Sequence, residues 1–125
     1  MKIRYGFVTN SSSSSFILGF KSKETMRAEL AAEDLTTEQF ADLIRECENA
    51  EGLNLNNVLN MIALEESFGY RYDGKKSCEE FETKAQGKDY FVSVNYSDND
   101  GSFYSEMEHY VVPELKCCLR RDSHH

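Results

Sequence analysis

Hydrophobic residues in the middle of the chain recur with the period of an amphipathic α-helix. The clearest case follows Thr36, because Thr36 and Gln39 have the spacing of a capping box at a helix start. The hydrophobic stripe that follows has the spacing i, i+3, i+4 and i+7, and it consists of Phe40, Leu43, Ile44 and Cys47. This segment therefore predicts a capped helix with one buried face.

Three further segments have helical character. Ser22 is suited to cap a helix over 23–32, since serine accepts hydrogen bonds from the free N–H groups of a first turn. The segment 55–68 carries a wide apolar stripe, and Gly69 after it is a typical helix stop. A short helix over 78–85 is the weakest pattern. The middle of the chain is thus predicted to be helical.

The period changes to two residues in the last third of the chain, as expected for β-strands. Apolar and polar residues alternate over 90–96 and again over 103–112. Residues 97–102 between them read Ser-Asp-Asn-Asp-Gly-Ser, types that tolerate the positive φ of tight turns. This pattern predicts a β-hairpin, and the apolar segment 16–20 predicts a further strand.

Together these segments predict one α+β domain over residues 1–125, with a small antiparallel sheet and a C-terminal β-hairpin packed against three or four helices. A length of 125 residues gives room for one modest core. No apolar run approaches the roughly 18–20 residues of a membrane span, and the first residues lack the apolar core of a signal peptide. We therefore expect a cytoplasmic protein that does not enter a membrane.

The first 17 residues read Met-Lys-Ile-Arg-Tyr-Gly-Phe-Val-Thr-Asn followed by five serines, Phe and Ile. This opening resembles that of a loose group of small, uncharacterised bacterial and bacteriophage proteins with a polyserine-phenylalanine start. The resemblance implies a microbial or phage origin. It implies no activity, because none is assigned to that group. Because serine hydroxyls compete for backbone hydrogen bonds, Ser11–Ser15 is predicted to be a loop.

The charge of the chain is uneven. Lysine and arginine total 14 against 22 aspartate and glutamate, which gives a net charge of -8. Residues 24–82 hold 15 of the acidic residues and only 5 basic ones. This balance argues against direct binding of nucleic acid, which requires a basic face. It favours association with a basic protein.

The acidic block includes carboxylates four residues apart, at Glu38, Asp42 and Glu46. Like charges at this helical spacing repel by a few tenths of a kcal/mol per pair, so this acidic ladder lowers the stability of the helix. A surface that costs stability in this way indicates a role in function. We predict a non-enzymatic binding protein, such as a phage-derived inhibitor, whose carboxylates occupy a basic, nucleic-acid-binding surface of its partner. The residues predicted to bind that partner are Glu38, Asp42, Glu46, Glu48, Glu65 and Glu66.

Asp98 and Asp100 precede Gly101, an arrangement that resembles part of an EF-hand calcium-binding loop. If Gly101 takes the sixth position of an EF-hand loop, the first position falls on Tyr96 and the twelfth on Met107. Calcium requires an oxygen ligand at the first position and a bidentate glutamate at the twelfth. The pattern therefore favours a turn over a calcium site.

The remaining reactive residues form no recognised motif. Four cysteines lack the close pairs of a zinc site and are expected to be free thiols: Cys47, Cys78, Cys117 and Cys118. His109 is expected at a sheet surface or satisfied in the core, and His124 and His125 resemble a tail or tag remnant. We accordingly assign no catalytic residue, metal or cofactor, and a small enzyme that uses His109 with a carboxylate remains an alternative.

A third class of function is suggested by the aromatic residues. The chain contains 7 tyrosines and 8 phenylalanines, and many of the tyrosines lie in its second half. Cross-strand aromatic pairs stabilise hairpins, and the same strands could pair between molecules. A structural or self-assembling protein is therefore the other alternative.

Overall fold

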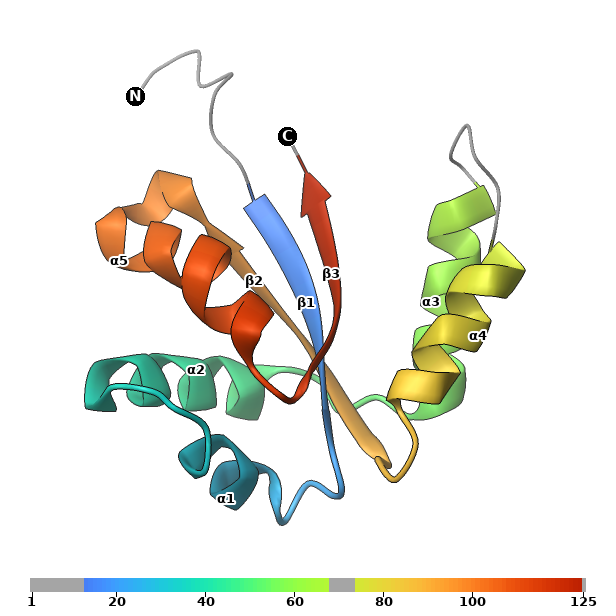
Figure 1. Cartoon of the computed structure of the whole chain (residues 1–125), viewed down its shortest axis with the longest axis horizontal. Coiled ribbons are helices and arrows are strands. Elements are labelled where there is room, and N and C mark those ends of the chain that lie inside the picture. The colour runs from blue at the N-terminus through green and yellow to red at the C-terminus, as the bar shows by residue number, and fades with distance from the viewer. Residues whose placement is uncertain (1–12, 68–73, 125) are drawn as a thin grey trace.

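The chain folds around β1 (Ser13–Phe20), which is the central strand of a three-stranded antiparallel sheet (Figure 1). The structure is a computed structural model, and it describes residues 13–67 and 74–124. The strand order is β2-β1-β3, with β2 (Tyr90–Ser97) and β3 (Cys118–His124) on either side of β1. The predicted α+β class with a small antiparallel sheet is confirmed.

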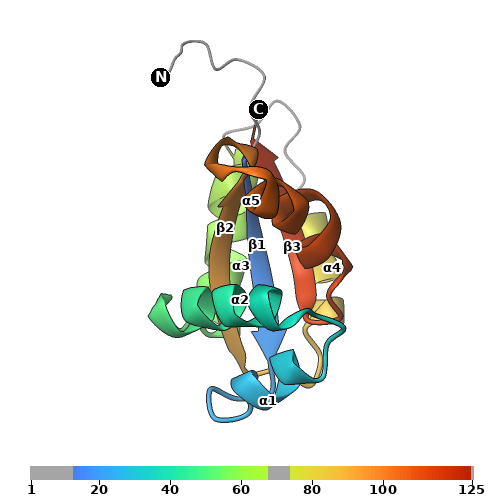
Figure 2. The ribbon, with the colours of Figure 1, turned by 90° about the vertical axis from the view of Figure 1, so that its left-hand side faces the viewer.

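Helical segments cover both faces of this sheet (Figure 1, Figure 2). One face carries α1 (Met26–Ala31), α2 (Thr37–Asn49), α5 (Ser102–Glu106), the π-helical η2 (Met107–Val111) and the 3-10 helix η3 (Val112–Glu114). The other face carries α3 (Leu55–Ser67) and α4 (Gly74–Lys84). A short 3-10 helix, η1 (Asp98–Asp100), joins β2 to α5.

Alternate residues of β1 point into two different cores. Phe16, Leu18 and Phe20 pack in the cluster beneath α1, α2 and the α5–η3 segment. Ile17 packs in a second cluster with residues of α3 and α4. The central strand is therefore buried on both faces, as its nearly continuous apolar sequence would require.

The helices of the middle region form near their predicted positions, with one correction: α1 begins at Met26 and its N-cap is Thr25, so the predicted Ser22 cap is wrong. The predicted helix stop at Gly69 lies outside the described residues.

The capping box of α2 is present, with Thr36 accepting from the N–H of Gln39. The predicted stripe is also present, since Leu43, Ile44 and Cys47 are buried. No described helix has the length and apolar character needed to cross a bilayer.

The predicted C-terminal hairpin is wrong. Residues 103–112 form α5, η2 and the start of η3, and the second edge strand is β3, farther along the chain. The alternation that suggested a strand also places Phe103 and Met107 four residues apart, on one face of a helix, where Met107 is fully buried. Gly101 has a φ of 118° at the break before α5, so the chain turns away from the sheet there.

The predicted serine loop is also wrong in its second half. Ser11 and Ser12 lie outside the described residues, whereas Ser13, Ser14 and Ser15 begin β1. A strand with hydrogen-bonding partners on both sides outweighs the weak local preference of serine for turns. In this strand the Ser14 hydroxyl donates to Glu108, and the Ser15 hydroxyl donates to Asn95 of β2.

Candidate functional site

An open groove of about 520 Å³ lies between α2 and α5. Both helices lie on the same face of the sheet, where α2 crosses the strands (Figure 2). The groove is lined by Glu38, Ala41, Asp42, Arg45, Phe103 and Tyr104. Two carboxylates of the predicted ladder therefore share a groove with two aromatic side chains of α5.

Asp42 departs from the expectation of a solvated acidic ladder, because its side chain is only 10% exposed. Its Oδ2 atom accepts a hydrogen bond of 2.8 Å from the Tyr96 hydroxyl of β2, and the Tyr104 hydroxyl lies 3.5 Å from Oδ1. Burial, followed by the hydrogen bond to Asp42, raises the pKa of Tyr96. The Tyr96 hydroxyl thus remains a donor, and Asp42 joins α2 to β2.

Two arginines partly neutralise the acidic side of α2. Arg45 forms ion pairs with Asp42 and with Glu46, and the hydrogen bond and charge of Asp42 raise the pKa of Arg45. Arg27 of α1 lies 3.4 Å from Glu48, in an exposed pair. Exposed pairs of this kind contribute little to stability. Of the predicted ladder, Glu38 is the exposed carboxylate that lines the groove.

The predicted partner-binding residues do not form one surface. Glu38, Asp42, Glu46 and Glu48 lie on α2. Glu65 and Glu66 lie on α3, which covers the opposite face of the sheet, and their side chains are outside the described part of the structure (Figure 1). A flat partner cannot reach both helices at once.

The aromatic residues are arranged differently from the self-assembly alternative. Tyr104 and Tyr110 lie in helical segments, and Tyr96 is buried in the first core. Tyr104 stacks on Tyr96 with ring centroids 6.3 Å apart and meets Phe103 edge to face at 5.1 Å. The aromatic strand over 103–112 on which that alternative depends is therefore absent, and aromatic rings form a wall of the groove instead.

A second group of side chains comes from the two segments that flank α5 in the chain. Asp98 belongs to η1, whereas Glu108 and His109 belong to η2. One carboxylate oxygen of each acid and one imidazole nitrogen all lie within 4.8 Å of one another. His109 is half-buried in a π-helical turn, so its expected position at a sheet surface is wrong.

Glu108 is the centre of this group and is fully buried. Its Oε2 atom accepts a 2.8 Å hydrogen bond from the Ser14 hydroxyl of β1, and the Arg121 guanidinium of β3 lies 3.8 Å away. The Nε atom of Arg121 also donates to Ser14 Oγ over 3.3 Å. The serine run and the last strand thus hold a carboxylate that the sequence analysis did not select.

The four cysteines are free thiols in the structure. Burial raises the pKa of Cys47 to about 12 and that of Cys118 to about 11, and it raises the pKa of Cys117 as well. Because the thiolate is the nucleophile and the metal ligand, these three thiols are poorly suited to either role near neutral pH.

Sequence reasoning weighed Asp98 as a calcium ligand and His109 beside a carboxylate, but it missed Phe103, Tyr104 and Glu108, and it did not bring Asp98, Glu108 and His109 together. All lie in or beside the region predicted as a hairpin, in which adjacent residues such as Glu108 and His109 would point to opposite faces. The helical spacing of Phe103 and Met107 was the available signal for the alternative.

Comparison with protein-family models, with curated proteins and with solved structures finds no match for this chain.

Proposed function

We propose that this chain is a non-enzymatic protein that binds a basic protein partner in the groove between α2 and α5. The observation that carries the proposal is that Glu38 and Asp42 line the same groove as Phe103 and Tyr104. Carboxylates beside aromatic faces suit lysine and arginine side chains, because such cations gain both charge attraction and cation–π attraction.

The groove supports a specific mode of binding. The exposed Glu38 carboxylate is available to pair with an incoming guanidinium, while Asp42 is held in place by Tyr96. Acidic charge exceeds basic charge along this side, since Arg45 is the one basic residue that lines the groove beside two acids. An arginine of the partner would stack against Phe103 or Tyr104 and donate to Glu38.

We infer that the partner is a protein with a basic surface of the kind that binds nucleic acid. The carboxylates spaced along α2 would occupy the positions on the partner's surface where the phosphates of nucleic acid otherwise bind. The partner could then no longer bind its nucleic acid. The resemblance of residues 1–17 to small phage proteins is in keeping with an inhibitor or modulator of this type. Because Glu65 and Glu66 lie on α3, across the sheet, they are not part of this surface.

A short arginine-rich peptide serves as the probe for this proposal. The peptide is titrated into the isotope-labelled protein, and binding is followed by amide chemical shifts and by fluorescence anisotropy at two salt concentrations. We expect the largest shifts at Glu38, Ala41, Phe103 and Tyr104, and weaker binding at the higher salt concentration.

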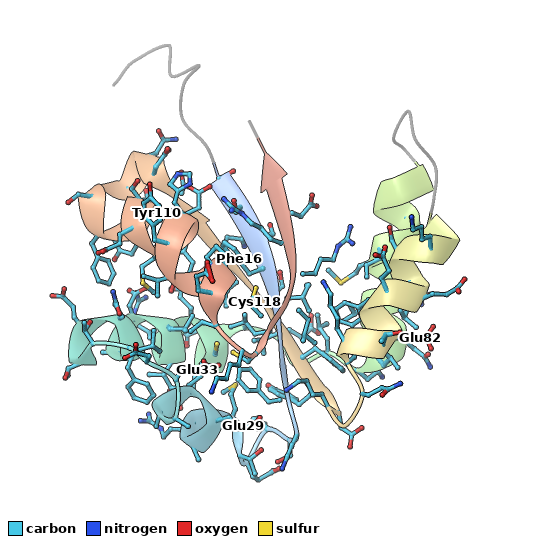
Figure 3. The ribbon with its side chains drawn as sticks, in the orientation of Figure 1. Phe16, Glu29, Glu33, Glu82, Tyr110 and Cys118 are labelled. Atoms are coloured by element: carbon cyan, nitrogen blue, oxygen red, sulfur yellow. The ribbon has the colours of Figure 1, made fainter. Side chains whose placement is uncertain are left out.

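A pair of charge-matched variants separates groove binding from general attraction to an acidic protein. Glu38→Lys alters the groove, whereas Glu82→Lys makes the same charge change on α4, across the sheet (Figure 3). We expect Glu38→Lys to weaken binding at least tenfold and Glu82→Lys to weaken it less than threefold. Equal losses in the two variants, or shifts centred on α3 and α4, would contradict the proposal.

A further inference from the structure

The donor atoms of Asp98, Glu108 and His109 are spaced as ligands of one ion. His109 Nε2 lies 3.6 Å from Asp98 Oδ2 and 3.5 Å from Glu108 Oε1. Both separations exceed the roughly 2.7–3.2 Å of an N–H···O hydrogen bond. Around a tetrahedral ion with bonds of about 2.0–2.2 Å, neighbouring ligand atoms lie about 3.3–3.6 Å apart. The two separations from His109 are therefore those of neighbouring ligands around a small metal ion, and the donor oxygens of Asp98 and Glu108 lie within 4.8 Å of each other.

The surroundings of Glu108 orient its carboxylate toward this point. Ser14 donates to Oε2, and Arg121 approaches the same oxygen, which leaves Oε1 as the atom nearest to His109. Metal-binding carboxylates are commonly held by such hydrogen bonds to their second oxygen. The carboxylate is also fully buried, and the Arg121 guanidinium on its Oε2 side offsets part of the cost of that charge; a metal ion on the Oε1 side would offset more of it.

The backbone contributes a second observation. Glu108 and His109 are consecutive residues of η2, a π-helical turn of five residues. Such turns are rare, and they are found frequently at functional sites. Asp98 approaches from η1, so residues on both sides of α5 meet at one place.

We propose that Asp98, Glu108 and His109 bind a divalent first-row transition-metal ion, with Zn²⁺ as the best candidate. An imidazole nitrogen among the ligands favours such ions over Mg²⁺ and Ca²⁺, which prefer oxygen alone. Three protein ligands leave a coordination position for water, as in zinc sites that act on substrates. This site is separate from the groove, and the inference does not depend on the proposed function.

Calorimetric titration of the metal-free full chain with Zn²⁺ tests the proposal, with Mn²⁺, Mg²⁺ and Ca²⁺ in parallel. We expect one equivalent of Zn²⁺ to bind. We also expect Mg²⁺ and Ca²⁺ to bind at least tenfold more weakly than Zn²⁺. Comparable binding of all four ions would show general attraction to an acidic surface and would overturn the proposal.

Asp98→Asn is the decisive variant, because the Asp98 side chain is partly exposed and its amide replacement keeps the shape of the residue. Asp100→Asn is the matched control, an exposed acid of the same short helix. We expect a tenfold or greater loss of Zn²⁺ affinity in Asp98→Asn and less than a twofold loss in Asp100→Asn.

Substitution of Co²⁺ for Zn²⁺ identifies the ligand atoms directly. Oxygen and nitrogen ligands give visible d–d absorption without the thiolate charge-transfer band that cysteine ligands produce. We expect no such band, and we expect His109→Gln to lower the Co²⁺ affinity at least tenfold. A thiolate band, or unchanged affinity in Asp98→Asn and His109→Gln, would place the ion elsewhere and overturn the proposal.

Discussion

The Tyr96 hydroxyl stabilises the fold because it satisfies a carboxylate that is almost out of solvent. Tyr96 donates to Asp42 over 2.8 Å, and the Asp42 side chain is 10% exposed. A hydrogen bond to a charged group contributes about 1.5–3 kcal/mol. We expect Tyr96→Phe to lower the free energy of unfolding by about that amount, as measured by urea denaturation.

Tyr104→Phe is the matched control for this experiment. The Tyr104 hydroxyl lies 3.5 Å from the same carboxylate and is only partly buried, so we expect a loss below about 1 kcal/mol. A loss in Tyr104→Phe as large as that in Tyr96→Phe would contradict the larger role assigned to the Tyr96 hydroxyl.

The buried thiol of Cys47 makes stability depend on pH in the alkaline range. Burial raises its pKa from 9.0 to about 12, so the unfolded chain loses the thiol proton at a lower pH than the folded chain. This contribution to stability is complete below about pH 9 and is lost progressively as the pH rises toward 12.

We therefore expect the stability difference between the native chain and Cys47→Ala to shrink from pH 8 to pH 11, by up to about 1.4 kcal/mol per pH unit above pH 9. Denaturation curves at a series of pH values measure this difference. A difference that stays constant over this range would mean that the thiol titrates normally in the folded state.

At the scale of single elements, the start of α2 is held by its capping box. Thr36 and Gln39 exchange hydrogen bonds of 3.0 and 3.1 Å between side chain and backbone. We expect Thr36→Ala to cost about 0.5–2 kcal/mol of unfolding free energy. Thr37→Ala, one residue later at an exposed position, is expected to change it by less than about 0.5 kcal/mol. Thermal denaturation of the two variants distinguishes them, and equal effects would contradict a role for the cap.

A comparison of α2 with residues 103–112 illustrates why some elements could be predicted and others could not. The α2 helix has a local start signal, its capping box, followed by an apolar stripe with helical spacing. This pattern fits an amphipathic helix and does not fit a strand. Residues 103–112 satisfy both the strand period and the helical spacing of Phe103 and Met107, and neither pattern is decisive by itself. The choice there depends on β1, which takes β2 as its partner from distant sequence. Long-range pairing of this kind is invisible to a local pattern.

For the molecule as a whole, the same limit explains how much of the candidate site could be predicted. Glu38 and Asp42 were found because the ladder is local to one helix. Their aromatic neighbours come from α5, more than 60 residues away from Asp42 in the case of Tyr104. The group formed by Asp98, Glu108 and His109 likewise depends on the π-helical turn η2, and no sequence pattern in this chain predicts such a turn.

The two proposed sites are connected through α5, which carries Phe103 and Tyr104 and lies between Asp98 and Glu108 in the chain. An ion bound by residues from both flanks of α5 would restrict this short helix and order the wall of the groove. We expect saturating Zn²⁺ to tighten binding of the arginine-rich peptide about fivefold or more, measured by anisotropy. Unchanged peptide affinity, when both ligands bind separately, would refute the connection and leave each site standing.

The central place of β1 in the sheet has a consequence for synthesis on the ribosome. This strand is translated before both of its neighbours, and β3 follows it by roughly 100 residues. At about 5–20 residues per second, the apolar segment Phe16–Phe20 waits for about 5–20 s before its second edge can be covered. During that interval an unpaired, hydrophobic strand is open to other chains or to a chaperone. The yield of folded protein in a cell should therefore depend on translation speed and chaperone supply as much as on final stability.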